Sequence, residues 1–259
     1  MEFVKYDVQG QVGVITIDRP KALNALNDQV LKELDQTMDQ VDQGQVRCLI
    51  ITGSGDKSFV AGADIAQMKD FNEDEGKAFG LLGNKIFRKI ETFPIPVIAA
   101  INGFALGGGN ELAMSCDIRY CSENALFGQP EVGLGITAGF GGTQRLARVI
   151  GSMSKAKELL YTAKNIKAKE AKEIGLVSEV FAQEDLMAQA MKTAQRIAGN
   201  APIAVRNTKA ALLQGIEEPM DKAMETEAGY FGNCFDSEDQ VEGMSAFLEK
   251  RKEKNFQNK

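Results

Sequence analysis

The chain contains no histidine among its 259 residues. Ser–His and Cys–His nucleophilic machinery is therefore excluded, and acid–base chemistry near neutral pH must use carboxylates, lysine, tyrosine or cysteine. Cysteine is also scarce, and no Cys-x-x-Cys pair occurs, so we predict neither a disulfide framework nor a zinc site. We expect reduced and mostly buried thiols at Cys48, Cys116, Cys121 and Cys234.

Signals for targeting, membranes and nucleotide cofactors are missing as well. The N-terminal segment lacks a secretory cleavage pattern, and no apolar run reaches the roughly 18 residues of a membrane span. We therefore expect a cytoplasmic protein that binds no membrane. The formal net charge of −6 argues against nucleic acid as a partner. No GxGxxG fingerprint or Walker A sequence occurs, so we expect no redox nucleotide and no metal.

What the sequence contains is typical of a globular protein with a large core, since 44% of residues are hydrophobic and 25% are charged. Alternating segments at 3–8 and 12–17, joined through Gly10, predict a β-hairpin. Asn27 predicts the start of a helix that runs to about Gln43. Further strands are expected at 46–52, 97–101, 117–121, 125–127 and 177–181. Further helices are expected at 64–71, 73–93, 106–115, 139–150, 152–162 and 168–174.

Strands alternate with helices in the first part of the chain, whereas only helices are expected after Gln183. This alternation predicts parallel strands joined by crossovers. We therefore divide the chain into an α/β core at residues 1–198 and a helical C-terminal region at 199–259.

Two turns of small residues are candidates for binding an oxygen atom through the backbone. Ala61-Gly62-Ala63 runs into a helical pattern at Asp64, and Gly107-Gly108-Gly109 opens the helix that carries Glu111. Free N–H groups at such turns bind anions or a developing oxyanion. Taken alone, the first turn is better explained as an ordinary helix start, and the second fits a flexible loop equally well.

Two glutamates follow turns of this kind. Glu111 lies just after the three glycines, and Pro130 presents Glu131 amid apolar neighbours, where burial raises the pKa of a carboxyl. Taken alone, Glu131 is better explained as a surface residue. Together, two tuned carboxylates and two N–H donors suit enolate chemistry beside a polarised carbonyl. The sequence does not establish that they converge.

Four segments in this order, AGADI, NGFALGGGNELAMSCD, FGQPEVGLGI and GGTQRL, resemble the crotonase (enoyl-CoA hydratase/isomerase) superfamily at the family's usual intervals. The resemblance covers nearly the whole chain. It implies an α/β fold, a crotonase-type spiral of ββα units with a helical C-terminal trimerisation region, in which two trimers often form a hexamer. It implies a short-chain acyl-CoA substrate and no separate cofactor.

The resemblance also implies roles for individual residues. The thioester oxygen would bind the N–H groups of Ala63 and Gly108. In the reversible hydration of a short-chain trans-2-enoyl-CoA, Glu111 would activate a water for attack at Cβ, and Glu131 would deliver a proton to Cα. Gly139 would orient the water through its backbone. Further substrate contacts are expected at Ala61, Asp64, Ile65 and Ala66 and, from a neighbouring subunit, at Phe247 and Lys250.

Three alternatives remain open. A Δ3-Δ2-enoyl-CoA isomerase usually changes one or both of the glutamate positions, so keeping both favours a hydratase. An RNA-binding member of the superfamily is disfavoured by the acidic charge balance. Intact glutamates argue against an inert scaffold subunit of a β-oxidation complex. Two residues depart from the family's commonest pattern, namely Asn110 and Ala138, and we expect neither to abolish activity.

Overall fold

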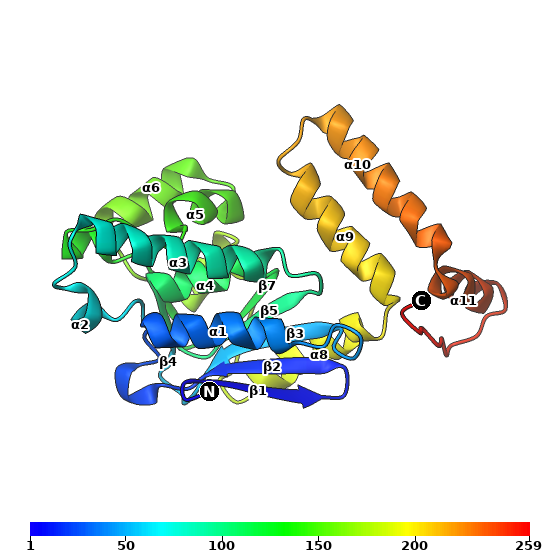
Figure 1. The fold of residues 1–259 in the computed structure, drawn as a ribbon, viewed down its shortest axis with the longest axis horizontal. Coiled ribbons are helices and arrows are strands. Elements are labelled where there is room, and N and C mark those ends of the chain that lie inside the picture. The colour runs from blue at the N-terminus through cyan, green and yellow to red at the C-terminus, as the bar shows by residue number, and fades with distance from the viewer.

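The chain begins with an antiparallel hairpin, and the other strands of the first sheet are parallel to their neighbours (Figure 1). The computed structural model describes all 259 residues. Strand order in this six-stranded sheet is β1-β2-β3-β5-β7-β10. Its strands are β1 (Val4–Gln9), β2 (Val12–Ile17), β3 (Cys48–Gly53), β5 (Val97–Ile101), β7 (Ile118–Ser122) and β10 (Glu179–Phe181).

A second sheet consists of four short strands. Three of them each follow a strand of the first sheet along the chain, and the fourth follows the helix Met153–Thr162. Its order is β4-β6-β8-β9, with only the last pair antiparallel. Because β3 leads to β4, β5 to β6 and β7 to β8, the chain repeats a ββα unit. The members are β4 (Ser58–Val60), β6 (Phe104–Leu106), β8 (Leu126–Gly128) and β9 (Ile166–Lys167).

Helices connect and cover these strands. In the first part of the chain they are α1 (Asp28–Gln40), α2 (Ile65–Met68), α3 (Glu73–Glu91), α4 (Gly108–Ser115), α5 (Gly142–Ile150), α6 (Met153–Thr162) and α7 (Ala168–Glu173). Then follow α8 (Leu186–Ala198), α9 (Pro202–Gly215), α10 (Met220–Asn233) and α11 (Glu238–Leu248). Short 3-10 helices occur at Pro20–Ala22, Glu131–Leu134 and Cys234–Asp236.

The central strands β3 and β5 are buried on both faces of the sheet, which explains their continuous apolar sequences. On β3, Leu49 and Ile51 belong to a core of 40 buried residues that includes the apolar faces of α1 and α3. Their neighbours Cys48 and Ile50 point to the other face, where a core of 10 residues includes Ala190, Ala194 and Ala198 of α8. The larger core lies on the side of the sheet that carries the second sheet and α4.

Helices α9 and α10 form an antiparallel pair that projects from the body of the molecule, and α11 follows at its end (Figure 1). A partly buried ion pair attaches this pair to the sheet: Lys209 Nζ on α9 lies 2.7 Å from Asp117 Oδ2 and donates to the carbonyl of Ile95 at 3.2 Å. Helices α9, α10 and α11 carry an exposed apolar face, which includes Leu212, Ile216, Met220, Phe231, Phe247 and Leu248.

The structure confirms the α/β fold class, the N-terminal hairpin, the parallel pairing and the helical C-terminal region. All four thiols are free, and three are buried. Three short strands, β4, β6 and β9, are absent from the sequence-based prediction, which placed a loop, a helix start and a connection there. The division at residue 198 stays a prediction; it falls between α8 and α9. None of the helices combines the length with the hydropathy that a membrane span requires.

Candidate active site

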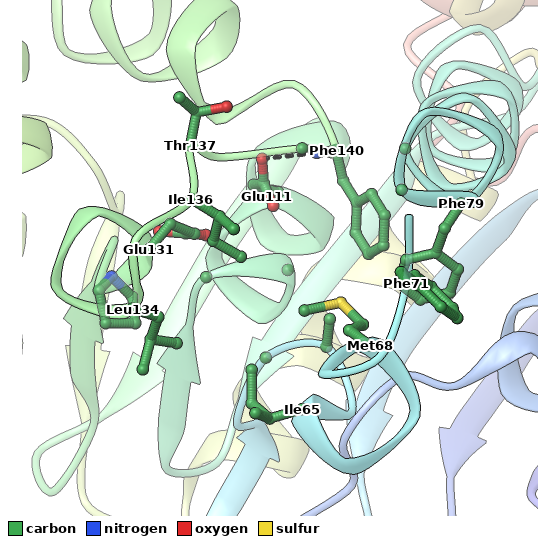
Figure 2. Close-up of a pocket in the computed structure, with 18 of the residues that line it drawn as sticks. Ile65, Met68, Phe71, Phe79, Glu111, Glu131, Leu134, Ile136, Thr137 and Phe140 are labelled. Atoms are coloured by element: carbon green, nitrogen blue, oxygen red, sulfur yellow. Dashed lines mark hydrogen bonds between the residues drawn. The ribbon is translucent and has the colours of Figure 1, made fainter. Parts of the chain in front are cut away.

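A cavity of about 670 Å³ lies where α2, α3, the start of α4 and the segment 130–140 meet (Figure 2). Its lining contains both glutamates, Glu111 and Glu131, and both small-residue turns. The rest is mostly apolar. Met68, Phe71, Phe79 and Phe140 form one side of the view in Figure 2, and Leu134 and Ile136 lie on the other, beside Glu131.

The glycines that open α4 are required by close contacts. Gly107 has φ 48° and ψ −120°, a backbone conformation that favours glycine, and its N–H donates to the carbonyl of Gly128 at 2.9 Å. A Cβ on Gly109 would lie 1.9 Å from the carbonyl oxygen of Val60. Only a glycine lets the first turn of α4 pack directly against β4, and this contact brings the two small-residue turns together.

Two backbone N–H groups at these turns have no acceptor in the protein. Around Ala63, the neighbouring groups pair with Leu26: the Leu26 N–H donates to the Gly62 carbonyl, and the Asp64 N–H donates to the Leu26 carbonyl. The Ala63 N–H takes no part in this ladder. Gly108 is the first residue of α4, so its N–H has no intrahelical acceptor. Both residues line the cavity and are free to bind an oxygen atom.

Glu111 is held by the loop that leads into α5. Its Oε1 accepts the N–H of Phe140 at 2.9 Å and the N–H of Gly142 at 2.6 Å (Figure 2 shows the first). The residue is only 1% exposed. Burial, and then the nearby charge of Glu131, raise the pKa of Glu111 to about 7, although the two N–H donors act in the opposite direction.

Glu131 is the first residue of the 3-10 helix that follows Pro130, and it is 8% exposed. When the Gln129 amide nitrogen faces it, that nitrogen lies 2.9 Å from Oε1 and 3.1 Å from Oε2. Burial raises the pKa of the Glu131 carboxyl, as we expected. Neither Glu131 nor Glu111 forms an ion pair with a lysine or arginine, so no direct ion pair opposes the upward shift of either pKa.

The apolar side of the cavity is a row of aromatic rings in edge-to-face contact. Ring centroids are 5.7 Å apart for Phe71 and Phe79, and 5.2 Å apart for Phe79 and Phe140. Phe140 in turn packs against Phe87 at 5.5 Å. Such contacts stabilise a fixed arrangement of the rings, which gives this side of the cavity an apolar wall.

The structure brings most of the predicted site residues to this one cavity. Its lining includes Glu111, Glu131, Ala63, Gly108, Gly139, Ala61 and Ile65. Asp64 and Ala66 lie next to it without lining it. The Asp64 side chain caps α2 by accepting the Ala66 N–H at 3.1 Å, and it binds Arg19 at 2.7 Å, so it fixes the turn that presents Ala63.

Phe247 and Lys250 do not line this cavity in the chain that carries them. Phe247 lies near the end of α11 and is 78% exposed, and Lys250 follows with φ 58°. Their contact with the substrate of a neighbouring subunit stays a prediction.

Several residues of the site are absent from the sequence-based prediction. They are Gln129 beside Glu131, Arg145 and Phe140 around Glu111, and Asn84, whose Nδ2 donates to the Gly139 carbonyl at 2.7 Å. The segment GGTQRL was noticed only for its family resemblance. A signal was present in it, since an arginine just after a glycine turn is suited to binding backbone carbonyls. No three side chains of Cys, Asp or Glu converge on a point that suits a metal ion.

The chain belongs to the enoyl-CoA hydratase/isomerase family, whose model matches residues 7–259. This match confirms the superfamily resemblance and makes the chain an enzyme of that class.

Relatives and solved structures agree with the family. The chain is 56% identical over 252 residues to the short-chain-enoyl-CoA hydratase of Clostridium acetobutylicum, covering 97% of this chain and 96% of that one. It is 55% identical, with the same coverage, to the crotonyl-CoA hydratase of Syntrophomonas wolfei. The structure of an enoyl-CoA hydratase from Bacillus anthracis superposes with a TM-score of 0.95 at 38% identity, over 99% of this chain and 100% of that one.

Proposed function

We propose that this enzyme catalyses the reversible hydration of short-chain trans-2-enoyl-CoA esters to 3-hydroxyacyl-CoA esters, with crotonyl-CoA as a substrate. One observation carries the proposal. Glu111 and Glu131, both buried and without a cationic partner, line the same cavity as the free N–H groups of Ala63 and Gly108. The names of the two most similar relatives given above support the same substrate class.

In the hydration direction, Glu111 takes a proton from water, and the water oxygen forms a bond to Cβ of the enoyl group. The π electrons of the Cα–Cβ bond move toward the thioester, so negative charge develops on its oxygen. The N–H groups of Ala63 and Gly108 stabilise that charge, and each such donor contributes about 2.7–4 kcal/mol to transition-state stability in comparable sites.

Protonation at Cα completes the addition. Glu131 donates its proton to Cα, the enolate electrons form the new C–H bond, and the carbonyl is restored. Glu111 now holds the proton that came from water, and its return to Glu131 resets the pair. Dehydration follows the same steps in reverse, starting with the proton on Glu111. A raised pKa in both carboxyls suits this exchange, because it favours the protonated form of whichever carboxyl must donate.

The position of the apolar residues supports an acyl group with a short hydrocarbon chain. The rings of Phe79 and Phe140 close one side of the cavity beside Glu111. They exclude bulk water from the reacting carbons, which strengthens the electrostatic effect of the N–H donors.

The residues present account for every proton transfer in this scheme, so we propose that no metal or redox cofactor takes part. Exhaustive treatment with EDTA is expected to leave the rate unchanged. Loss of activity that zinc restores would contradict the proposal.

We further propose that the enzyme works in the cytoplasm as a homohexamer of two trimers. The exposed apolar face of α9, α10 and α11 supports an assembly in which other copies of the chain cover these residues, since a face of this kind favours association. The particle mass in solution tests the proposal.

A direct comparison of two substrates tests the proposed reaction. Crotonyl-CoA should lose the absorbance of its conjugated thioester when the enzyme is added, whereas 3-butenoyl-CoA should not be converted at a comparable rate. Fast conversion of 3-butenoyl-CoA to the conjugated isomer, with slow hydration, would instead establish the Δ3-Δ2-enoyl-CoA isomerase.

A further inference from the structure

The loop Phe140–Gly142 supplies both N–H groups that bind Oε1 of Glu111, so the direction of this carboxylate depends on what holds the loop. The peptide group between Gly139 and Phe140 is held on both sides, since Asn84 donates to its carbonyl at 2.7 Å while its N–H donates to Glu111. The carbonyl between Gly141 and Gly142 accepts backbone N–H groups of α5, including that of Arg145 at 2.8 Å.

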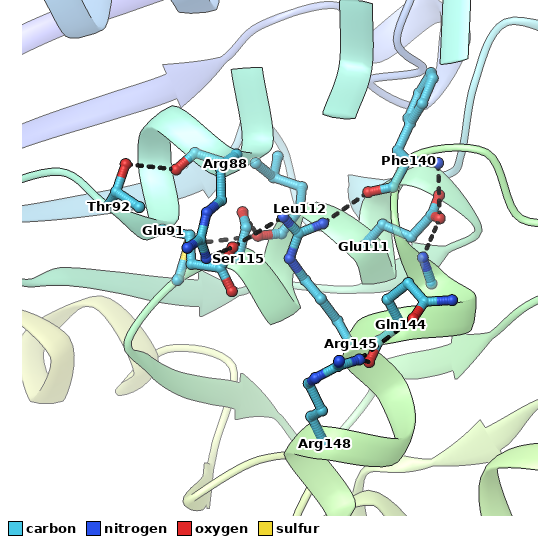
Figure 3. A network of polar contacts seen from close by, with 12 residues as sticks. Arg88, Glu91, Thr92, Glu111, Leu112, Ser115, Phe140, Gln144, Arg145 and Arg148 are labelled. Atoms are coloured by element: carbon cyan, nitrogen blue, oxygen red, sulfur yellow. Dashed lines mark hydrogen bonds and ion pairs between the residues drawn. The ribbon is translucent and has the colours of Figure 1, made fainter. Parts of the chain in front are cut away.

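The peptide group between these two is held by a side chain. Arg145, in the first turn of α5, donates from Nη1 to the Phe140 carbonyl at 2.8 Å (Figure 3). The same Nη1 also packs against Gly141, since a Cβ on that residue would lie 2.2 Å from it. The Phe140 carbonyl therefore cannot rotate without breaking a charge-assisted hydrogen bond.

A carboxylate on another helix fixes the arginine itself. Nη2 of Arg145 binds Oε2 of Glu91, the last residue of α3, at 3.0 Å, and Arg88 binds the same oxygen at 2.9 Å (Figure 3). The Arg145 side chain is only 11% exposed, so the pair is shielded from solvent. A chain of contacts thus runs from Glu91 through Arg145 and the Phe140 carbonyl to the N–H groups on Glu111.

The geometry points to Arg145 and Glu91 as positioning residues for Glu111. By fixing the central peptide group of the loop, they keep both N–H donors on Oε1 and leave Oε2, which accepts no hydrogen bond from the protein, to bind the reacting water. The inference rests on the proposed function. It adds that catalysis depends on a pair that contacts neither the substrate nor the water.

Arg145 also acts on Glu111 electrostatically, in a direction that can be measured. Two charged groups act on Glu111: Glu131 from the 3-10 helix raises its pKa, and Arg145 from α5 lowers it. Glu91 and Arg88 lie beyond Arg145. Hydration requires ionised Glu111, so the rate falls as pH drops through its pKa. Removing the charge of Arg145 raises that pKa and moves the acidic limb of the rate profile to higher pH.

Four variants of the full-length enzyme test the inference with crotonyl-CoA as substrate. Arg145→Gln should lower kcat about 10- to 100-fold, the effect of misplacing a catalytic group slightly, with little change in KM. Arg145→Lys keeps the charge and should recover part of the rate and most of the pH profile. Glu91→Gln should lower kcat less. Arg148→Gln is the matched control, because Arg148 lies one turn further along α5 and binds only Gln144 of its own helix.

The outcomes separate cleanly. If Arg145→Gln matches Arg148→Gln in kcat and in the position of the acidic limb, the inference is overturned. If Arg145→Gln does not fold, Arg145→Lys and Glu91→Gln must each lower kcat below that of Arg148→Gln, and equality would overturn it. Wild-type enzyme that fails to hydrate crotonyl-CoA would refute the proposed function instead, whatever the variants do.

Discussion

A Cβ atom on Gly107 would lie 2.8 Å from Oε1 of Glu131. The residue that immediately precedes the helix of Glu111 is therefore also the one against which the second carboxylate packs. The two catalytic carboxylates proposed here are thus placed by one turn of the backbone, although they come from segments 20 residues apart.

Gly107→Ala should consequently abolish most hydration while the protein still folds. The new methyl group displaces Glu131, and the backbone at φ 48° becomes strained. The rate with crotonyl-CoA and a thermal melt measure the two effects. Gly229→Ala on α10, where a Cβ meets nothing within 4 Å, is the control and should keep full activity. Normal turnover in Gly107→Ala would refute the contact.

Replacing either carboxyl with an amide of the same shape should remove nearly all activity but leave binding intact. Glu131→Gln loses the proton carried to Cα, and Glu111→Gln loses the base that activates water. Calorimetric titration with 3-hydroxybutyryl-CoA should give similar affinities for both variants and wild type. The double variant should be scarcely slower than each single one, because both residues act on one water. Turnover near the wild-type rate in Glu131→Gln would refute its role.

Glu111 should also give the stability a pH dependence of definite sign. Its pKa is raised to about 7 in the folded protein, whereas an unfolded glutamate titrates near about 4.3. The stabilising effect of its proton is therefore complete below the unfolded pKa and is lost as pH rises through the folded pKa. The amide of Glu111→Gln does not ionise. As pH rises from the unfolded to the folded pKa, the free energy of unfolding should therefore fall less in this variant than in wild type, by on the order of 1–3 kcal/mol. Parallel melting curves against pH would contradict this.

Truncation after Gly243 should weaken both assembly and substrate binding. It removes exposed apolar residues such as Phe247, together with the basic end of the chain, which suits the phosphates of CoA. Particle mass and the KM for crotonyl-CoA are the measurements, and raised salt should mimic part of the KM change. Phe247→Ala and Lys250→Ala separate the apolar contribution from the charged one. If the truncated protein still forms a hexamer and its KM is unchanged, the prediction is wrong and the tail is only a solvated helix end.

The larger elements could be predicted from local pattern because local chemistry determines them. Alternation marks the hairpin at 4–17, and the side chain of Asn27 caps α1 as expected, accepting the N–H of Val30. The strands β4, β6 and β9 have only two or three residues each. Runs this short carry no period, and their pairing depends on tertiary contacts such as that between Gly109 and Val60.

The site could be predicted only in part for the same reason. The glutamates and the small-residue turns are visible as types of residue in a pattern, and the family resemblance assigned their roles. Their meeting at one cavity depends on the packing of α4 against β4. The supporting residues could not be assigned from local pattern alone. Arg145 follows a glycine turn, but its partner Glu91 is 54 positions away. Gln129 belongs to no repeating pattern.

The reaction of crotonyl-CoA in D₂O, followed by NMR, tests the central claim most directly. The account predicts 3-hydroxybutyryl-CoA with a hydroxyl at Cβ and one deuterium at Cα, formed by wild-type enzyme and not by Glu111→Gln or Glu131→Gln. Consumption of the substrate without addition of water would contradict it, and so would either variant forming as much of this product as the wild-type enzyme.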